Sequence, residues 1–190
     1  SAILLAGLAA KGRTSVTEPS LSRDHTERML PLFGVPVERE GLTVSIDGPT
    51  SLAAADVVVP GDPSSAAFLA VAAALIPDSD ITIERMSLNP TRTGFLDVMR
   101  AMGADVEVVL RGGESEPYGD VTVRFTPSLV GTTVESEAIP GMIDEIIVLS
   151  LLATTASTPT RFKGVAELRV KESDRLAAIV QGISAFGGEA

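Results

Sequence analysis

The stretch that decides the fold is 64–104, SSAAFLAVAAALIPDSDITIERMSLNPTRTGFLDVMRAMGA. Its alanine-rich start predicts a helix over 64–76, because alanine is the best helix former. The alternating segment 80–85 predicts a strand. Residues 91–102 predict an amphipathic helix whose apolar side chains share one face, namely Phe95, Leu96, Met99 and Met102.

The flanking residues extend this pattern into a unit. Three valines within 56–60 predict a strand ahead of the first helix. Residues 105–110 and 120–125 predict two further strands, joined by a glycine-rich acidic loop as in a hairpin. The resulting order is β-α-β-α-β-β. A helix between strands implies a parallel pair, so we expect an α/β fold with a mixed sheet.

The same succession of elements occurs in residues 1–35, 64–104 and 143–188. Each segment has an apolar helix, a strand, a polar loop and an amphipathic helix that ends near a glycine. Those glycines, Gly34, Gly103 and Gly187, predict left-handed helix ends. Because the first helix of each segment is apolar almost all round, we expect these helices to be buried behind the sheets.

Composition excludes several classes of protein. With 45% hydrophobic and 21% charged residues, the 190-residue chain is not disordered. It has no cysteine and one histidine, His25, which excludes disulfides, a thiol nucleophile and Cys/His zinc sites. A net charge of −10 argues against nucleic acid or an anionic membrane as the main partner. No apolar run reaches the roughly 18–20 residues that span a bilayer.

The two ends predict a piece of a longer protein. Ser1 starts directly on an apolar run without a targeting segment, and Ala190 follows residues typical of a turn into another strand.

Polar residues precede the amphipathic helix of each segment, at 22–25, 89–92 and 169–175. Free N–H groups at a helix start, together with Arg or Lys, make an anion site. Ordinary capping, by Asp24 or Thr91, explains the first two loops equally well.

The third loop is the most basic part of the chain, with five of its 15 Lys and Arg residues in 161–175. Lys171 and Arg175 lie four residues apart across the predicted helix start, and Glu172 lies between them. This favours either an anion site with an embedded acid/base or a surface lattice of ion pairs, with Ser173 as the helix cap.

Two other places also have two interpretations. Asp144 precedes an apolar helix, where it serves either as a carboxylate favoured by the helix dipole or as a base at the rim of a dry site. The loop 60–65, with two prolines and a glycine, is either a turn within a domain or a hinge between domains.

Four strings together resemble the 5-enolpyruvylshikimate-3-phosphate synthase (3-phosphoshikimate 1-carboxyvinyltransferase) family. They are RVKESDR at 169–175, NPTRTG at 89–94, SRDHTE at 22–27 and PGDPSSA at 60–66. The resemblance runs through all 190 residues in order. The chain is therefore similar to the middle part of a family member, because family members are more than twice this length.

The resemblance implies an inside-out α/β barrel of two domains, each with three β-α-β-α-β-β units around buried parallel helices. Residues 1–59 would form one incomplete unit of one domain. Residues 60–190 would form one complete and one incomplete unit of the other, with the hinge near 59–62.

The implied reaction transfers the enolpyruvyl group of phosphoenolpyruvate to the 5-hydroxyl of shikimate 3-phosphate and releases phosphate, as a step of aromatic amino acid biosynthesis. It implies no metal or organic cofactor, a cytoplasmic enzyme that is monomeric at full length, and a 190-residue piece that is inactive alone.

The motif match also implies roles for single residues. Asp144 would be the base at the 5-hydroxyl, and Lys171 would bridge that hydroxyl and the phosphate. Glu172 would exchange the proton at the methylene carbon. The remaining substrate contacts would come from Arg175 on phosphoenolpyruvate and from Ser22 and Arg23 on shikimate 3-phosphate, with Arg92 and His25 as further candidates. Glu167 stands where some members carry Asn.

Two other functions are alternatives to this one. The enolpyruvyl transferase of cell-wall synthesis, which acts on UDP-N-acetylglucosamine, shares the fold, and a non-catalytic repeat scaffold would show the same periodicity. The string RVKESDR favours shikimate chemistry.

Overall fold

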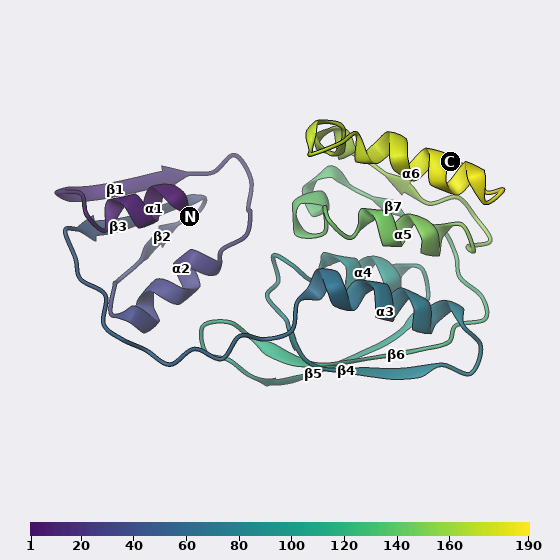
Figure 1. Ribbon diagram of the computed structural model, residues 1–190, viewed down its shortest axis with the longest axis horizontal. Coiled ribbons are helices and arrows are strands. Elements are labelled where there is room, and N and C mark those ends of the chain that lie inside the picture. Colours follow the sequence, from purple (N-terminus) through teal and green to yellow (C-terminus); the bar gives the residue numbers. More distant parts are fainter. The chain divides into compact units, whose positions relative to one another are not determined.

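The computed structural model describes all 190 residues, and the chain divides into two compact units (Figure 1). Unit 1 comprises Ser1–Val59 with Gly112–Pro117, and unit 2 comprises Pro60–Arg111 with Tyr118–Ala190. No helix is both long enough and apolar enough to cross a membrane.

Unit 1 is built on a three-stranded sheet. Its elements are α1 (Ala2–Gly7), β1 (Gly12–Thr17), α2 (His25–Met29), the 3-10 helix η1 (Leu30–Phe33), β2 (Glu38–Glu40) and β3 (Thr43–Gly48). β3 is the central strand and runs antiparallel to both β1 and β2. The core of this unit is small and aliphatic, formed by Leu4, Leu30, Val35, Val44 and Ile46.

Unit 2 contains the longer helices. Its elements are α3 (Pro63–Leu75), β4 (Asp80–Ser87), α4 (Gly94–Ala101), β5 (Asp105–Gly112), β6 (Tyr118–Arg124), β7 (Thr133–Val134), η2 (Ser136–Gly141), α5 (Ile146–Ala153), β8 (Arg161–Phe162), η3 (Val165–Val170) and α6 (Arg175–Ala185). In Figure 1, α3 and α4 cover one face of the β4–β6–β5 sheet, α5 packs on these helices, and α6 packs on α5.

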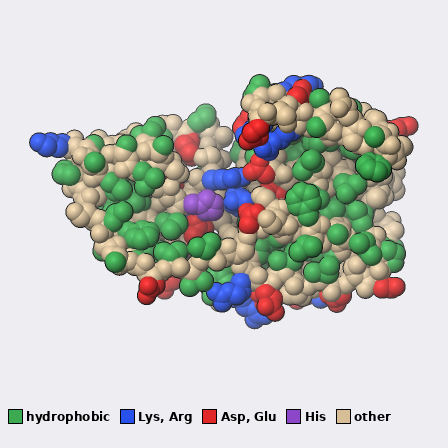
Figure 2. Space-filling model, viewed as in Figure 1, with side chains coloured by type: hydrophobic (Ala, Val, Ile, Leu, Met, Phe, Trp, Pro, Cys, Tyr) green, Lys and Arg blue, Asp and Glu red, His purple; other side chains and the backbone are tan.

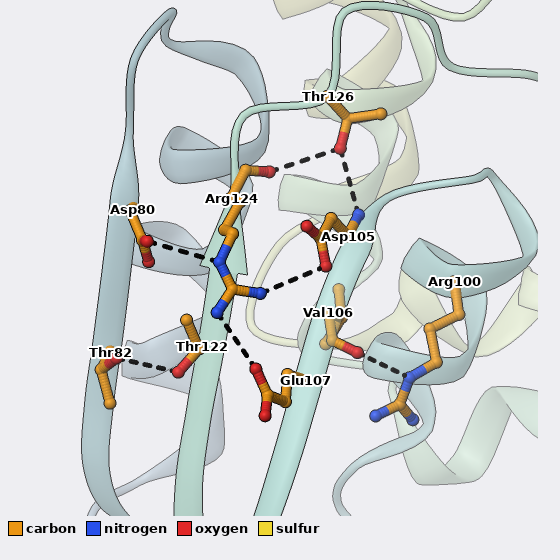
Figure 3. Close-up of polar contacts among 9 residues, drawn as sticks. All are labelled: Asp80, Thr82, Arg100, Asp105, Val106, Glu107, Thr122, Arg124 and Thr126. Atoms are coloured by element: carbon orange, nitrogen blue, oxygen red, sulfur yellow. Dashed lines mark hydrogen bonds and ion pairs between the residues drawn. The ribbon is translucent and has the colours of Figure 1, made fainter.

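One arginine joins the three strands of this sheet on its outer face (Figure 3). Arg124, on the central strand β6, reaches Asp80 of β4 at 3.3 Å and Glu107 and Asp105 of β5 at 3.0 and 3.5 Å. β4 is antiparallel to β6, with a bulge at Arg85, whose φ is 53°. The neighbouring strands β5 and β6 confirm the predicted hairpin.

The alanine-rich helix α3 lies where the sequence predicts it, but it is not buried all round. The Asp62 carboxylate accepts a hydrogen bond from the Ser65 amide at 2.9 Å and so caps the helix. Its alanines pack into the core, whereas Phe68 and Leu69 are more than half exposed. Figure 2 shows such hydrophobic side chains over the surface of this unit. The expectation of a wholly buried helix was therefore wrong for this chain, because nothing in it covers that face of α3.

The amphipathic helix is confirmed, and it starts later than predicted. Phe95, Met99 and Met102 are fully buried. The side-chain oxygen of Asn89 accepts hydrogen bonds from the amide and hydroxyl of Thr91, at 2.9 and 2.7 Å. This turn competes with the helix and delays its start to Gly94.

The strand predicted over 56–60 is absent. Val58 and Val59 are exposed, and only Gly61 pairs, in one parallel bridge with Met86. Valine favours a strand only where a neighbouring strand and a packing surface exist, and here the segment has neither. Of the expected parallel pair on either side of α3, only this single bridge is present. The strands on either side of α5, β7 and β8, do pair in parallel.

The predicted left-handed glycines are confirmed. Gly34, Gly103 and Gly187 have φ values of 81°, 91° and 82°. Each follows the last helix of its segment, where a residue with a Cβ would be strained.

Candidate active site

Arg175 and two carboxylates form the centre of the candidate site in unit 2. Asp144 lies in the turn before α5, and its Oδ1 accepts a hydrogen bond of 2.9 Å from Nη1 of Arg175. Glu172 accepts one of 2.6 Å from Nη2. One guanidinium therefore holds carboxylates from two different elements, and both Asp144 and Arg175 keep a third of their side chains exposed.

Arg175 is the first residue of α6, and the N-cap of the helix determines this position. The Asp174 carboxylate accepts a hydrogen bond of 2.9 Å from the Ala177 amide and so caps this helix. The sequence suggested Ser173 as the cap, which is wrong by one residue. As the first residue of the helix, Arg175 points its side chain back toward the preceding turn.

The charges of this cluster reinforce one another. The pKa of the Glu172 carboxyl is lowered first by a hydrogen bond from the backbone amide of Glu172 itself, and next by the hydrogen bond from the Arg175 guanidinium. Hydrogen bonds to Glu172 and Asp144 raise the pKa of Arg175. Glu172 is therefore an ionised carboxylate at neutral pH and can accept a proton.

A cavity of about 230 Å³ lies beside this cluster. Asp144, Ser173 and Arg175 contribute the polar part of its lining, and Ile143, Leu168 and Ile179 contribute much of the apolar part. The volume fits a small anion of a few carbon atoms, and the apolar lining strengthens electrostatic interactions within it.

Lys171 forms an ion pair of its own. Its ammonium donates to the Glu167 carboxylate, four residues earlier in the first turn of η3. Arg169 pairs with Asp174 at 3.3 Å. The basic loop thus carries several ion pairs, as one of the two interpretations of the sequence expected, while Arg175 also borders the cavity.

Ser22 and Arg23 lie in unit 1, in the exposed loop between β1 and α2. The Ser22 hydroxyl donates to the carboxylate of Glu18. His25 opens α2, and its Nδ1 lies 2.6 Å from a carboxylate oxygen of Glu116. Arg92 lies in unit 2, where it contacts Asp62 and Ser64.

The sequence did not single out Glu145, the residue next to Asp144. It is 1% exposed and accepts a hydrogen bond from Ser64. A carboxylate within the apolar run IDEIIVL was the one available signal, and its partner lies 81 residues away in the sequence.

No group of three or more His, Cys, Asp or Glu side chains is arranged to hold a metal ion.

Comparison with known proteins places the chain in a family. The family model for EPSP synthase (3-phosphoshikimate 1-carboxyvinyltransferase) matches residues 1–190. The chain belongs to the EPSP synthase family. It is 52% identical over 190 residues to the 3-phosphoshikimate 1-carboxyvinyltransferase of Geobacillus thermodenitrificans, and 49% identical over 188 residues to that of Bacillus licheniformis.

The chain spans 44% of the length of these EPSP synthases, while they cover 100% and 98% of it. Among solved structures, EPSP synthase from Acinetobacter baumannii matches with a TM-score of 0.88 and 44% identity, over 96% of this chain and 41% of that one. The enolpyruvyl transferase NikO from Streptomyces tendae matches with a TM-score of 0.65 at 24% identity, over 84% of this chain and 37% of that one. The α/β enolpyruvyl transferase fold is thereby established, and the cell-wall enzyme considered above is a distant relative only.

Proposed function

We propose that the protein containing these residues transfers the enolpyruvyl group of phosphoenolpyruvate to the 5-hydroxyl of shikimate 3-phosphate and releases phosphate. The observation that carries this proposal is the Asp144–Arg175–Glu172 cluster beside a small cavity, in a chain of the EPSP synthase family. Two anionic substrates need cations with fork geometry, and a guanidinium supplies it.

The reaction needs proton transfer at two centres. The methylene carbon of phosphoenolpyruvate gains a proton, and the 5-hydroxyl oxygen bonds to the adjacent carbon as its own proton leaves. The resulting tetrahedral intermediate then loses phosphate and one methyl proton, which restores the double bond. Asp144 accepts the hydroxyl proton, Glu172 exchanges the proton at the methylene carbon, and Lys171 bridges the hydroxyl and the phosphate.

Binding of phosphoenolpyruvate at Arg175 couples to this chemistry. An anionic group of the substrate competes with Asp144 and Glu172 for the guanidinium. Glu172 then loses a hydrogen bond that lowers its pKa, so it holds a proton more readily. Substrate binding therefore frees both carboxylates at the moment when proton transfer is needed.

The proposal extends to the architecture. Residues 1–59 and 60–190 belong to the two domains of an inside-out barrel of repeated β-α-β-α-β-β units, with the hinge near 59–62. Three successions of helix, strand and helix in the element order support this repeat. Ser22 and Arg23 bind shikimate 3-phosphate. The enzyme is a cytoplasmic monomer that uses no metal or organic cofactor, and the 190-residue chain alone does not turn over substrate.

Phosphate release by the full-length enzyme tests the proposal. We expect release with both substrates together and none when either is omitted. Release that does not depend on shikimate 3-phosphate would overturn the proposed function.

A further inference from the structure

A buried polar cluster joins the starts of α3 and α5. Ser64, in the first turn of α3, donates its hydroxyl proton to a carboxylate oxygen of Glu145, which precedes α5. The same hydroxyl oxygen accepts a hydrogen bond of 2.8 Å from Nη2 of Arg92. Arg92 also contacts the Asp62 carboxylate at 2.9 Å. The Ser64 hydroxyl thus links the Arg92 guanidinium to the Glu145 carboxylate, and the three residues come from separate segments of the chain.

This cluster costs free energy to bury. Glu145 is 1% exposed and the Arg92 side chain 13% exposed, and Nε of Arg92 is buried without a hydrogen-bond partner. Desolvating such groups is unfavourable unless their contacts compensate, and an apolar residue in place of Glu145 would avoid the cost. A cluster of this kind is consistent with a functional role.

The turn that carries Arg92 is held by hydrogen bonds of its own. Asn89 is fully buried and holds the turn through Thr91, and the Arg92 amide donates to the Asn89 carbonyl at 2.9 Å. The backbone of Arg92 is therefore held by contacts separate from those that its guanidinium makes with Ser64 and Asp62.

The cluster fixes the backbone next to the candidate base. Glu145 is the N-cap of α5, and its carbonyl accepts a hydrogen bond of 2.9 Å from the Leu149 amide. Asp144 is the preceding residue, so a rotation of the shared peptide would move its carboxylate away from Arg175. The contact with Ser64 opposes that rotation.

From this juxtaposition we infer that Glu145 is a positioning residue of the active site: hydrogen-bonded to Ser64, itself held by Arg92, it orients Asp144 toward the reacting hydroxyl. The inference rests on the proposed function. Glu145 touches no substrate and acts through Asp144.

The test uses four variants of the full-length enzyme. Ser64→Ala removes the donor, and Glu145→Ala removes the acceptor. Glu145→Gln keeps an acceptor oxygen for the serine hydroxyl and serves as the conservative rescue. Ser150→Ala is the matched control, because Ser150 is a buried serine of α5 that donates to its own helix at the Ile146 carbonyl.

The readouts are kcat and KM for both substrates, measured below the melting temperature of each variant. Misplacement of a catalytic group by about 1 Å costs up to roughly 100-fold, so we expect Ser64→Ala and Glu145→Ala to lower kcat about tenfold or more, with KM within about twofold. Glu145→Gln and Ser150→Ala should keep kcat within about threefold of the unsubstituted enzyme.

The inference fails if Ser64→Ala keeps kcat within about twofold, or if it raises KM at constant kcat. Ser64→Ala decides the matter where Glu145→Ala does not fold. Failure of the proposed function is a separate result, since the unsubstituted enzyme would then release no phosphate in response to shikimate 3-phosphate.

Discussion

Replacing Leu149 of α5 by alanine tests the packing that holds the candidate base. Leu149 is fully buried, and α5 begins two residues after Asp144. The substitution removes three carbon groups at about 0.8 kcal/mol each, which is about 2.4 kcal/mol of transfer free energy. The cavity left behind adds to this, and the total for such sites is about 3–5 kcal/mol.

The same helix supplies the control. Leu151 is 54% exposed, so Leu151→Ala should lower the free energy of unfolding by less than about 1 kcal/mol. Both variants remove the same atoms from the same helix, and they differ only in the face that the side chain occupies.

Urea unfolding of the 190-residue chain measures both effects. The single tyrosine, Tyr118, lies in unit 2 with α5, so its fluorescence reports on the unfolding of that unit. Leu149→Ala should shift the transition midpoint well below that of Leu151→Ala at a similar m-value. Equal midpoints would refute the packing of α5 described here.

Three further predictions concern charge. In the full-length enzyme, Lys171→Met or Asp144→Ala should reduce turnover at least about 100-fold, the scale of general acid–base catalysis, with an unchanged circular dichroism spectrum. Burial raises the pKa of Glu145, although the Ser64 hydrogen bond and the Arg92 charge act to lower it. The Glu145 carboxyl therefore keeps its proton to a higher pH in the folded chain than in the unfolded chain. Its contribution to stability therefore falls as pH rises from the ordinary value of 4.5 through the folded pKa, and Glu145→Gln should raise the melting temperature near neutral pH but not in acid. Burial alone would raise the pKa of Asp62, yet the amide and hydroxyl of Ser65 and the Arg92 guanidinium lower it. Asp62→Ala should thus cost about 1 kcal/mol in urea unfolding near neutral pH, and the loss should shrink as the pH falls through the folded pKa.

Each of these has a contradicting outcome. Unchanged turnover would remove Lys171 or Asp144 from its assigned role. A melting temperature of Glu145→Gln that follows the unsubstituted chain at every pH would mean that Glu145 pays no burial cost. For the Asp62 cap, Asp56→Ala in the exposed linker is the control, and equal losses would refute the capping contact.

Local sequence patterns predicted the helices and strands that carry their own signals. The amphipathic periodicity around Phe95 and Met99 predicted a buried face, and the structure confirms it. The valines of 56–60 gave an equally strong local signal that was wrong, because a strand depends on a partner and not on its own residues.

The candidate site was predicted less completely. Lys171, Glu172 and Arg175 stood out as a local excess of charge, yet spacing alone did not show that Lys171 pairs with Glu167 while Arg175 pairs with Asp144. Ion pairs at short range depend on side-chain directions at helix ends, and the residue that caps α6 sets those directions.

The sequence by itself determined the family, the order of helices and strands over residues 64–125 and the identity of the charged residues, because each of these resides in neighbouring residues or in strings of seven or fewer. Only the tertiary structure decided that Glu145 is buried against Ser64, that Asp144 meets Arg175, and that one face of α3 stays exposed. The two contacts join residues 81 and 31 positions apart, and burial and partnership at such separations follow from how whole elements pack and not from the residues beside them.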